Sequence, residues 1–120
     1  MSDYLQLASR YIALWNEADA AQRRSLLAEH WAEDATYADP LVQRVGHTEI
    51  DALIGAVQQR FPGFRFALDG RVDGHGDHLR FSWTLGPEGG DPVVKGTDFA
   101  LVENGRFKAV TGFIDLAPGD

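Results

Sequence analysis

The stretch from Val93 to Leu116, VVKGTDFALVENGRFKAVTGFIDL, predicts a long antiparallel hairpin. Apolar residues alternate with polar or small ones on both sides of Asn104-Gly105. Alternation with a period of two is typical of a strand that buries one face. Asn-Gly favours the tight turn of a hairpin, because both residues tolerate a positive φ. We therefore expect strands over 93–102 and 106–116.

Two shorter runs upstream alternate in the same way, over 64–69 and 79–85. The segment between them, DGRVDGHGDH, is rich in glycine and aspartate and predicts a turn-rich connection. GPEGGDP, at 86–92, predicts a loop before the hairpin. The C-terminal half is thus expected to form an antiparallel sheet.

The N-terminal half shows helical spacing of apolar residues instead. This spacing predicts a first helix over 3–17, with Ser2 or Asp3 as its cap. A second helix is predicted to begin near Asp19 and to run through AAQRRSLLAEHW, which ends at Trp31. The first two helices would therefore follow each other closely.

A third helix is predicted over 46–61, where apolar residues occur at i, i+3, i+4, i+7 and i+11: Ile50, Leu53, Ile54, Val57 and Phe61. Thr48 and Asp51 resemble a capping box at its start, and Pro62-Gly63 would stop it. ATYAD, at 35–39, predicts a short strand before this helix. Helices followed by antiparallel strands indicate a single α+β domain over 1–120, with three N-terminal helices packed on a bent, mostly antiparallel sheet.

Composition excludes several classes of partner. The net charge is −7, and no cluster of basic residues is larger than Arg23-Arg24, so nucleic acids and anionic membranes are not expected partners. No apolar run approaches the length of a membrane span, which is about 18 residues. The first residues do not resemble a signal peptide, and there is no cysteine, so we expect a cytoplasmic protein. The segment His75-Gly-Asp77-His78 is better explained as a hairpin tip than as a metal site, and no metal is expected.

Asp98 is the most informative residue of the predicted sheet. By alternation it shares a face with small and apolar residues, namely Val94, Gly96, Ala100 and Val102. A carboxyl group there must be hydrogen-bonded, paired or protonated, because burying an isolated charge is costly. The alternative is a register in which Asp98 points to solvent. If Asp98 faces inward, the outer face carries Thr97, Phe99 and Leu101, and apolar outer surface favours a homodimer through the sheet.

Tyr11 and Asp39 each have a structural and a functional interpretation. Tyr11 lies in the apolar stripe of the first helix, where a buried phenol usually finds a hydrogen-bond partner. Asp39 precedes Pro40, so it is either a turn residue or an acid-base group at the mouth of a pocket. Aromatic residues such as Phe113 are expected in the core or the pocket wall. The residues predicted to contact a substrate are Trp15, Trp31, Leu53, Phe61, Phe81, Trp83, Val110 and Ile114.

Four segments of the chain resemble the nuclear transport factor 2 superfamily, which includes ketosteroid isomerases and SnoaL-like polyketide cyclases. They are RYIALWNEAD, WAEDATYADP, GHTEIDALI and GTDFALVENGRFKAVTGFID, and they occur in the order of that superfamily's motifs over essentially the whole chain. The resemblance implies a cone-shaped fold built from three helices and a bent sheet. Members of the superfamily commonly form dimers through this sheet.

The resemblance to ketosteroid isomerases also implies roles for three residues. Asp39 matches the general base of those enzymes, and Tyr11 matches the tyrosine that donates a hydrogen bond to the substrate oxygen. Asp98 matches a second donor, an aspartic acid that is held protonated. Trp31 and Ile54 stand where ketosteroid isomerases carry supporting tyrosines, so that network is not expected here.

Together these residues imply a cofactor-free enzyme that moves a proton next to the carbonyl group of a small apolar compound. The reaction would be an isomerisation or an aldol-type cyclisation. Two alternatives remain open at this point: a binding module for hydrophobic small molecules, and an interaction domain whose cavity is packed shut.

Overall fold

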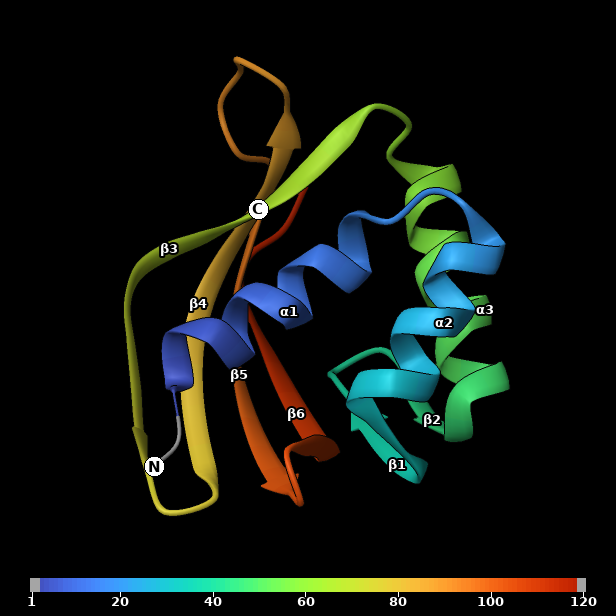
Figure 1. Ribbon diagram of the computed structural model, residues 1–120. Coiled ribbons are helices and arrows are strands. Elements are labelled where there is room, and N and C mark those ends of the chain that lie inside the picture. Colours follow the sequence, from blue (N-terminus) through green and yellow to red (C-terminus); the bar gives the residue numbers. More distant parts are fainter. Residues whose placement is uncertain (1–2, 119–120) are drawn as a thin grey trace.

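The computed structural model describes residues 3–118 and shows three helices on one curved, unclosed sheet of six strands (Figure 1). The elements, in chain order, are α1 Tyr4–Asn16, α2 Ala20–His30, β1 Trp31–Ala38, β2 Gln43–Val45, α3 Gly46–Arg60, β3 Phe64–His75, β4 His78–Pro87, β5 Val94–Glu103 and β6 Arg106–Leu116. The predicted α+β architecture is confirmed.

The strand order across the sheet is β2-β1-β6-β5-β4-β3. Only β1 and β6 pair in parallel, and the other neighbours are antiparallel. The predicted hairpin of β5 and β6 is confirmed, with positive φ at Asn104 and Gly105 in its turn. Figure 1 shows α1 lying across one face of the sheet, while α2 and α3 lie side by side next to β1.

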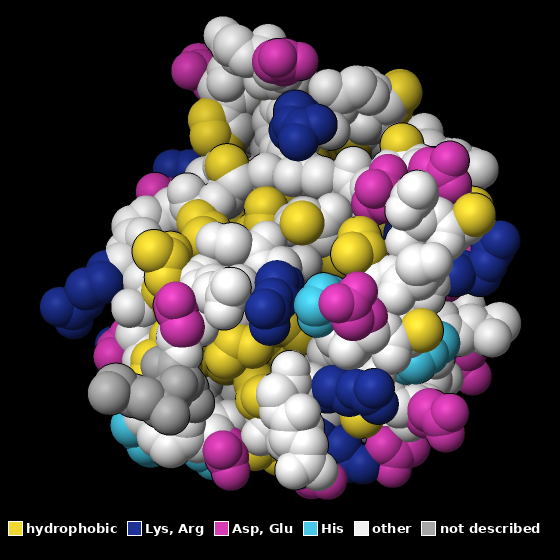
Figure 2. Space-filling view, in the orientation of Figure 1, with side chains coloured by type: hydrophobic (Ala, Val, Ile, Leu, Met, Phe, Trp, Pro, Cys, Tyr) yellow, Lys and Arg dark blue, Asp and Glu magenta, His cyan; other side chains and the backbone are white. Residues whose placement is uncertain are grey.

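Alternation in β5 places the two faces as predicted. The inward face is buried from Val94 through Asp98 to Val102, and the outward residues between them are more exposed. Apolar side chains from this inner face pack with those of the helices in one core. Figure 2 shows apolar side chains also reaching the surface in the middle of the face that carries α1, with most charged side chains nearer its edges.

The end of α2 and the start of α3 correct two predictions. Trp31 has extended backbone angles, pairs with Phe107 and opens β1 instead of continuing the helix, because its side chain is buried in the core. The expected capping box of Thr48 and Asp51 is absent from the start of α3. Val45 is the N-cap there and has no side-chain cap, and Glu49 accepts a hydrogen bond from its backbone N–H.

Asp51 is the sixth residue of α3, too far from its start to cap it, and its carboxylate pairs with Arg23 instead. The distance from Arg23 Nε to Asp51 Oδ1 is 2.5 Å, and Gln58 Oε1 also accepts from this guanidinium. Arg23 is buried, so the pairing offsets the cost of removing its charge from water. This contact joins α2 to α3.

The turn-rich connection predicted over 69–78 is mostly strand. β3 continues to His75 through an irregularity in register between Asp69 and Asp73, with Gly70 at φ +80°. A bulge of this kind lets a strand bend without ending. The hairpin tip predicted at His75 to His78 is confirmed, since these two residues pair across it. Within residues 3–118, no helix combines the length and the apolar character that crossing a bilayer requires.

Candidate active site

A cavity of about 250 Å³ lies between the inner face of the sheet and helices α1 and α3. Tyr11, Asp39 and Asp98 all line it, and the rest of its wall is mainly apolar. The structure therefore brings together the three residues predicted to carry chemistry, which come from α1, the loop after β1 and the middle of β5.

Tyr11 and Asp98 form a direct, buried hydrogen bond at the floor of this cavity. Tyr11 Oη donates to Asp98 Oδ2 at 2.5 Å, and Trp83 Nε1 donates to the other carboxyl oxygen at 3.0 Å. Burial raises the pKa of Asp98 to about 6, and the charge of Asp39 adds to this effect, although the two hydrogen bonds oppose it.

The phenol of Tyr11 keeps its proton at neutral pH. Burial, followed by the charge of Asp98, raises the pKa of Tyr11 well above its usual value near 10. Its ring packs against Phe81, with centroids 4.8 Å apart, and against Trp31 at 5.9 Å. This packing holds the hydroxyl at the cavity floor.

Asp39 is held by a turn at the rim of the same cavity. Its Oδ1 accepts hydrogen bonds from the backbone N–H groups of Leu41, at 2.8 Å, and Val42, at 3.1 Å. Its Oδ2 accepts from the Tyr37 hydroxyl at 2.7 Å. The turn and the cavity thus both account for an acid at this position, because the turn orients the carboxylate that lines the cavity.

Tyr37 is a site residue that the sequence interpretation missed. It lies two residues before Asp39, and alternation along a strand places such residues on one face, which was the available signal. Burial, followed by the charge of Asp98, raises the pKa of the Tyr37 phenol, so it remains a donor.

Gly112 provides the space between the two acids. A Cβ atom there would lie 2.8 Å from Asp98 Oδ1 and 3.5 Å from Asp39 Cβ. Gly96 has a similar function under Trp83, because its Cβ would lie 2.3 Å from the indole ring. Both glycines allow large or charged groups to lie directly against the sheet.

The predicted wall residues divide into two groups. Five of them line the cavity: Trp15, Leu53, Phe61, Trp83 and Ile114. The other three, Trp31, Phe81 and Val110, are fully buried and do not line it. Trp31 and Phe81 pack against the Tyr11 ring, so they support the site from behind.

Further wall residues were not predicted, and one expectation about the core was wrong. The additional lining residues are Tyr37, Leu41, Val57, Arg60, Phe66, Leu85, Val94, Ala117 and Pro118. Phe113, expected in the core or the wall, is 51% exposed on the outer face of the sheet. There it meets Phe99 edge to face, with ring centroids 5.7 Å apart.

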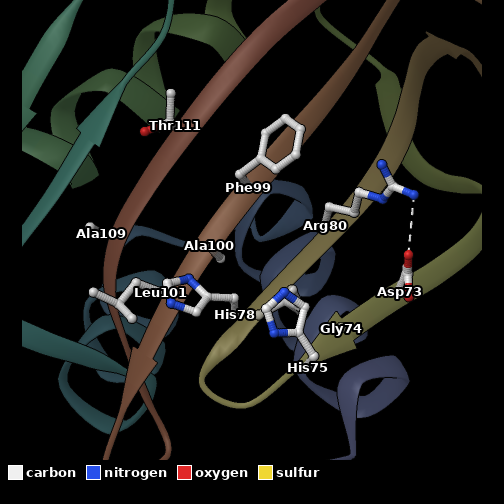
Figure 3. Close-up of a pocket in the computed structure, with 11 residues that line it drawn as sticks. Asp73, Gly74, His75, His78, Arg80, Phe99, Ala100, Leu101, Ala109 and Thr111 are labelled. Atoms are coloured by element: carbon white, nitrogen blue, oxygen red, sulfur yellow. Dashed lines mark hydrogen bonds and ion pairs between the residues drawn. The ribbon is translucent and has the colours of Figure 1, made fainter.

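A larger hollow, of about 470 Å³, lies on the opposite face of the sheet and contains none of the three predicted catalytic residues. Figure 3 shows its side chains on strands β3 to β6, with α1 behind them. It includes His75, His78 and the ion pair of Arg80 with Asp73, whose N–O distance is 3.1 Å. The chemistry predicted from the sequence therefore belongs to the inner cavity.

Comparison with known proteins shows the family to which the chain belongs. The model of the SnoaL-like domain matches residues 8–110. No curated protein gives a significant match. A candidate isomerase of the SnoaL-like family from Agrobacterium tumefaciens is 46% identical, with a TM-score of 0.90 over 96% of this chain and 99% of that chain.

Two more distant structures share the fold. A candidate ketosteroid isomerase from Kribbella flavida is 24% identical, with a TM-score of 0.70 over 96% of this chain and 79% of that one. An NTF2-like protein of unknown function from Cytophaga hutchinsonii is 12% identical, with the same TM-score over 96% and 92% of the two chains. The match to the domain model and the 46% identity to a SnoaL-like protein show that this chain belongs to the SnoaL-like family, on the nuclear transport factor 2-like fold.

Proposed function

We propose that the protein is a cytoplasmic, cofactor-free enzyme that transfers a proton next to the carbonyl group of a small apolar compound. The observation that carries this proposal is that Asp39, Tyr11 and Asp98 line one mainly apolar cavity. The isomerase names of the Agrobacterium and Kribbella proteins support the same class of reaction. Isomerisation of an enone and aldol-type cyclisation both begin with this proton transfer.

Asp39 is the base in this proposal. Its Oδ1 accepts two backbone hydrogen bonds, whereas Oδ2 accepts only the hydrogen bond from Tyr37. A carboxylate oxygen has two lone-pair sites, so Oδ2 keeps one for a substrate proton. The turn holds this oxygen in place, which reduces the cost of bringing base and carbon together.

Tyr11 and Asp98 stabilise the negative charge that develops on the substrate oxygen. Trp83 Nε1 donates to one oxygen of Asp98, and the other oxygen lies 2.5 Å from Tyr11 Oη, so the phenol and the carboxyl group can share a proton. Asp98 takes up a proton from solvent before the substrate enters and shares it in a hydrogen bond with Tyr11 Oη, so that Tyr11 can turn its own O–H to the enolate oxygen as charge develops. A pKa of about 6 makes this uptake accessible near neutral pH.

The size of the cavity limits the substrate. A volume of about 250 Å³ is slightly below the usual range of small-molecule sites, which begins at about 300 Å³, and suits a compound of one or two rings. Arg60, whose guanidinium lies 5.6 Å from the centre of the Phe61 ring, provides a positive charge among the lining residues.

A binding module on the same fold is the second candidate. It is favoured by one observation, namely that the turn accounts for Asp39 without any reaction. A domain with a packed-shut cavity does not fit a volume of about 250 Å³.

Exchange of carbon-bound hydrogen separates the enzyme from the binder. The protein is incubated with 1-tetralone in D2O, and deuterium entry next to the carbonyl is followed by NMR. The enzyme proposal expects exchange faster than in buffer, and much slower with Asp39→Asn. If 1-tetralone bound but exchanged no faster than in buffer, the binding module would be the better interpretation.

The homodimer is also part of the proposal. Phe99 is 44% exposed and Phe113 is 51% exposed, and the two rings are in contact on the outer face of the sheet. A second copy packed on this face would remove them from water. Sedimentation should show a dimer at micromolar concentration and a monomer for the variant with both Phe99→Ser and Phe113→Ser, and a monomeric wild type would contradict the proposal.

A further inference from the structure

The exposure of the lining residues shows where the cavity opens to solvent. Most of the wall is buried or half-buried, whereas Leu41, Arg60 and Pro118 are exposed. These three residues come from the loop after β1, the last position of α3 and the segment after β6. The opening therefore lies beside Arg60, and a ligand that fills the cavity ends close to this side chain.

Among the described residues that line this cavity, Arg60 carries the one positive charge. Within residues 3–118 its guanidinium makes no hydrogen bond or ion pair, and it lies over the face of the Phe61 ring, 5.6 Å from the centroid. A cation in this position is attracted by the π electrons of the ring. Because Phe61 is part of the cavity wall, this contact keeps the guanidinium at the opening, and its N–H donors remain available to an anion.

The end of α3 accounts for a positive charge near Arg60 but not for its place at the cavity. A cation in the last turn of a helix is stabilised by the helix dipole. Gln59 is also exposed in this turn, does not line the cavity, and stands where a cation would interact with the dipole in the same way. The location of Arg60 in the cavity wall is therefore a separate observation.

The two acids determine which end of an anionic ligand would point outward. Asp98 lies at the floor and Asp39 at the rim, so a negative charge inside the cavity would be repelled by their carboxylates. Arg60 attracts a negative charge at the opening. A ligand with a carbonyl and a carboxylate at opposite ends would thus place its carboxylate at Arg60 and its carbonyl at Tyr11. Only its apolar part would occupy the volume of about 250 Å³.

We propose that Arg60 binds a carboxylate of the substrate, which is then an apolar ketone with one anionic group at the end away from its carbonyl. The planar guanidinium matches a carboxylate through two parallel hydrogen bonds. This inference rests on the proposed function and deepens it, because it names the class of substrate and the residue that selects and orients it. The contact would fix which end of the substrate reaches Asp39.

A pair of ligands tests this assignment on the wild-type protein. 1-Tetralone-6-carboxylate and its carboxamide have the same rings, the same ketone and nearly the same size, and only the former is charged. We expect the carboxylate to bind about threefold to tenfold more tightly than the carboxamide at low salt. This advantage should shrink as salt is added, because an exposed ion pair is screened. Equal affinities at low salt, or no binding of the carboxylate, would overturn the proposal.

Substitution of Arg60 then assigns the preference to this residue. Arg60→Gln should make the two affinities equal, and Arg60→Lys, which keeps the charge without the planar group, should retain part of the difference. Arg24→Gln is the matched control, since it removes the same charge from an exposed position of α2 outside the cavity wall and should keep the wild-type ratio. A ratio that survives Arg60→Gln, or that falls equally with Arg24→Gln, would overturn the assignment.

Deuterium exchange distinguishes a failure of this inference from a failure of the proposed function. Entry of deuterium next to the carbonyl of either ligand reports proton transfer, whereas the titrations report the contact with Arg60. A preference for the carboxylate that Arg60→Gln abolishes, without exchange in either ligand, would refute the enzyme and leave the contact standing. Exchange without any preference would refute the role of Arg60 and leave the enzyme standing.

Discussion

The floor and the rim of the cavity hold one carboxyl group each, in opposite kinds of surroundings. Asp98, at the floor, is 1% exposed and receives its hydrogen bonds from the side chains of Tyr11 and Trp83. Asp39, at the rim, is half-buried and receives two of its hydrogen bonds from backbone N–H groups. Gly112 lies between these two residues, and because it has no side chain, both can approach the sheet there.

This difference shows how one cavity can give two carboxyl groups different chemical properties. Desolvation at the floor raises the pKa of Asp98 to about 6, which lets it exchange a proton near neutral pH. The turn at the rim fixes the direction of the Asp39 carboxylate and leaves part of it open to a ligand. In the proposed reaction the base therefore comes from the rim, and the groups that stabilise the developing charge come from the floor.

Removing the base from the rim should have the largest effect. Asp39→Asn keeps the carbonyl oxygen that Leu41 and Val42 contact, so the turn should survive. Turnover in an enone-isomerisation assay should fall about 10²–10⁴-fold, the usual contribution of a general base. Affinity for a planar phenol should stay the same or increase, because a negative charge has been removed. Unchanged turnover would refute the assignment of the base.

At the floor, Asp98→Asn should change how the free energy of unfolding of the protein depends on pH. Because the pKa of Asp98 is about 6 in the folded protein and 3.8 in the reference state, its stabilising contribution is complete below pH 3.8 and is lost as the pH rises through 6. Asparagine does not titrate, and it can accept from Trp83 while donating to Tyr11. The variant should gain about 2–3 kcal/mol in free energy of unfolding relative to wild type between pH 4 and pH 8.

Urea unfolding at both pH values measures this gain. Asp91→Asn changes an exposed acid in the loop before β5 and is the matched control, for which we expect no such gain. A difference between Asp98→Asn and wild type that did not depend on pH would show that the Asp98 pKa is not raised.

Gly112→Ala tests the separation of floor and rim. The added methyl group would lie 2.8 Å from Asp98 Oδ1, so the carboxyl group must move. Overpacking of this kind costs about 1–3 kcal/mol, and we expect about 2 kcal/mol in the free energy of unfolding together with reduced turnover. Gly55→Ala makes the same change inside α3, where the nearest atom is a guanidinium nitrogen of Arg23 at 3.4 Å, so no atom comes as close as at Gly112. Equal effects of the two variants would argue against a special role for Gly112.

We expect the smallest effect from removing the side-chain hydroxyl that donates to Asp39 at the rim. Tyr37→Phe removes the hydrogen bond to Asp39 Oδ2 but leaves both backbone hydrogen bonds. We expect a loss of about 1 kcal/mol in the free energy of unfolding and a change of less than about tenfold in turnover. Tyr4→Phe is the control, since its hydroxyl bonds to the Gly76 carbonyl away from the cavity. A loss as large as that of Asp39→Asn would assign Tyr37 a direct role in proton transfer.

Features that depend on local backbone geometry could be predicted from the sequence. The three helices, the strands of the C-terminal half, the turn at Asn104-Gly105 and the inward direction of Asp98 all follow from residue patterns along short segments, whereas β2 was not predicted. The resemblance to a known superfamily then selected Tyr11, Asp39 and Asp98 as a set. These three residues line one cavity in the structure.

Only the tertiary structure decided which groups are partners. Tyr11 and Asp98 are 87 residues apart, so no local pattern could show that the phenol and the carboxyl group share a hydrogen bond and that Trp83 donates to the other oxygen of Asp98. Trp31 was assigned to a helix by its neighbours, but pairing with β6 and burial in the core make it the first residue of a strand. The sequence specifies which face a side chain takes, because that depends on the backbone period. Its hydrogen-bond partner, its pKa and the volume beside it depend on how distant segments pack.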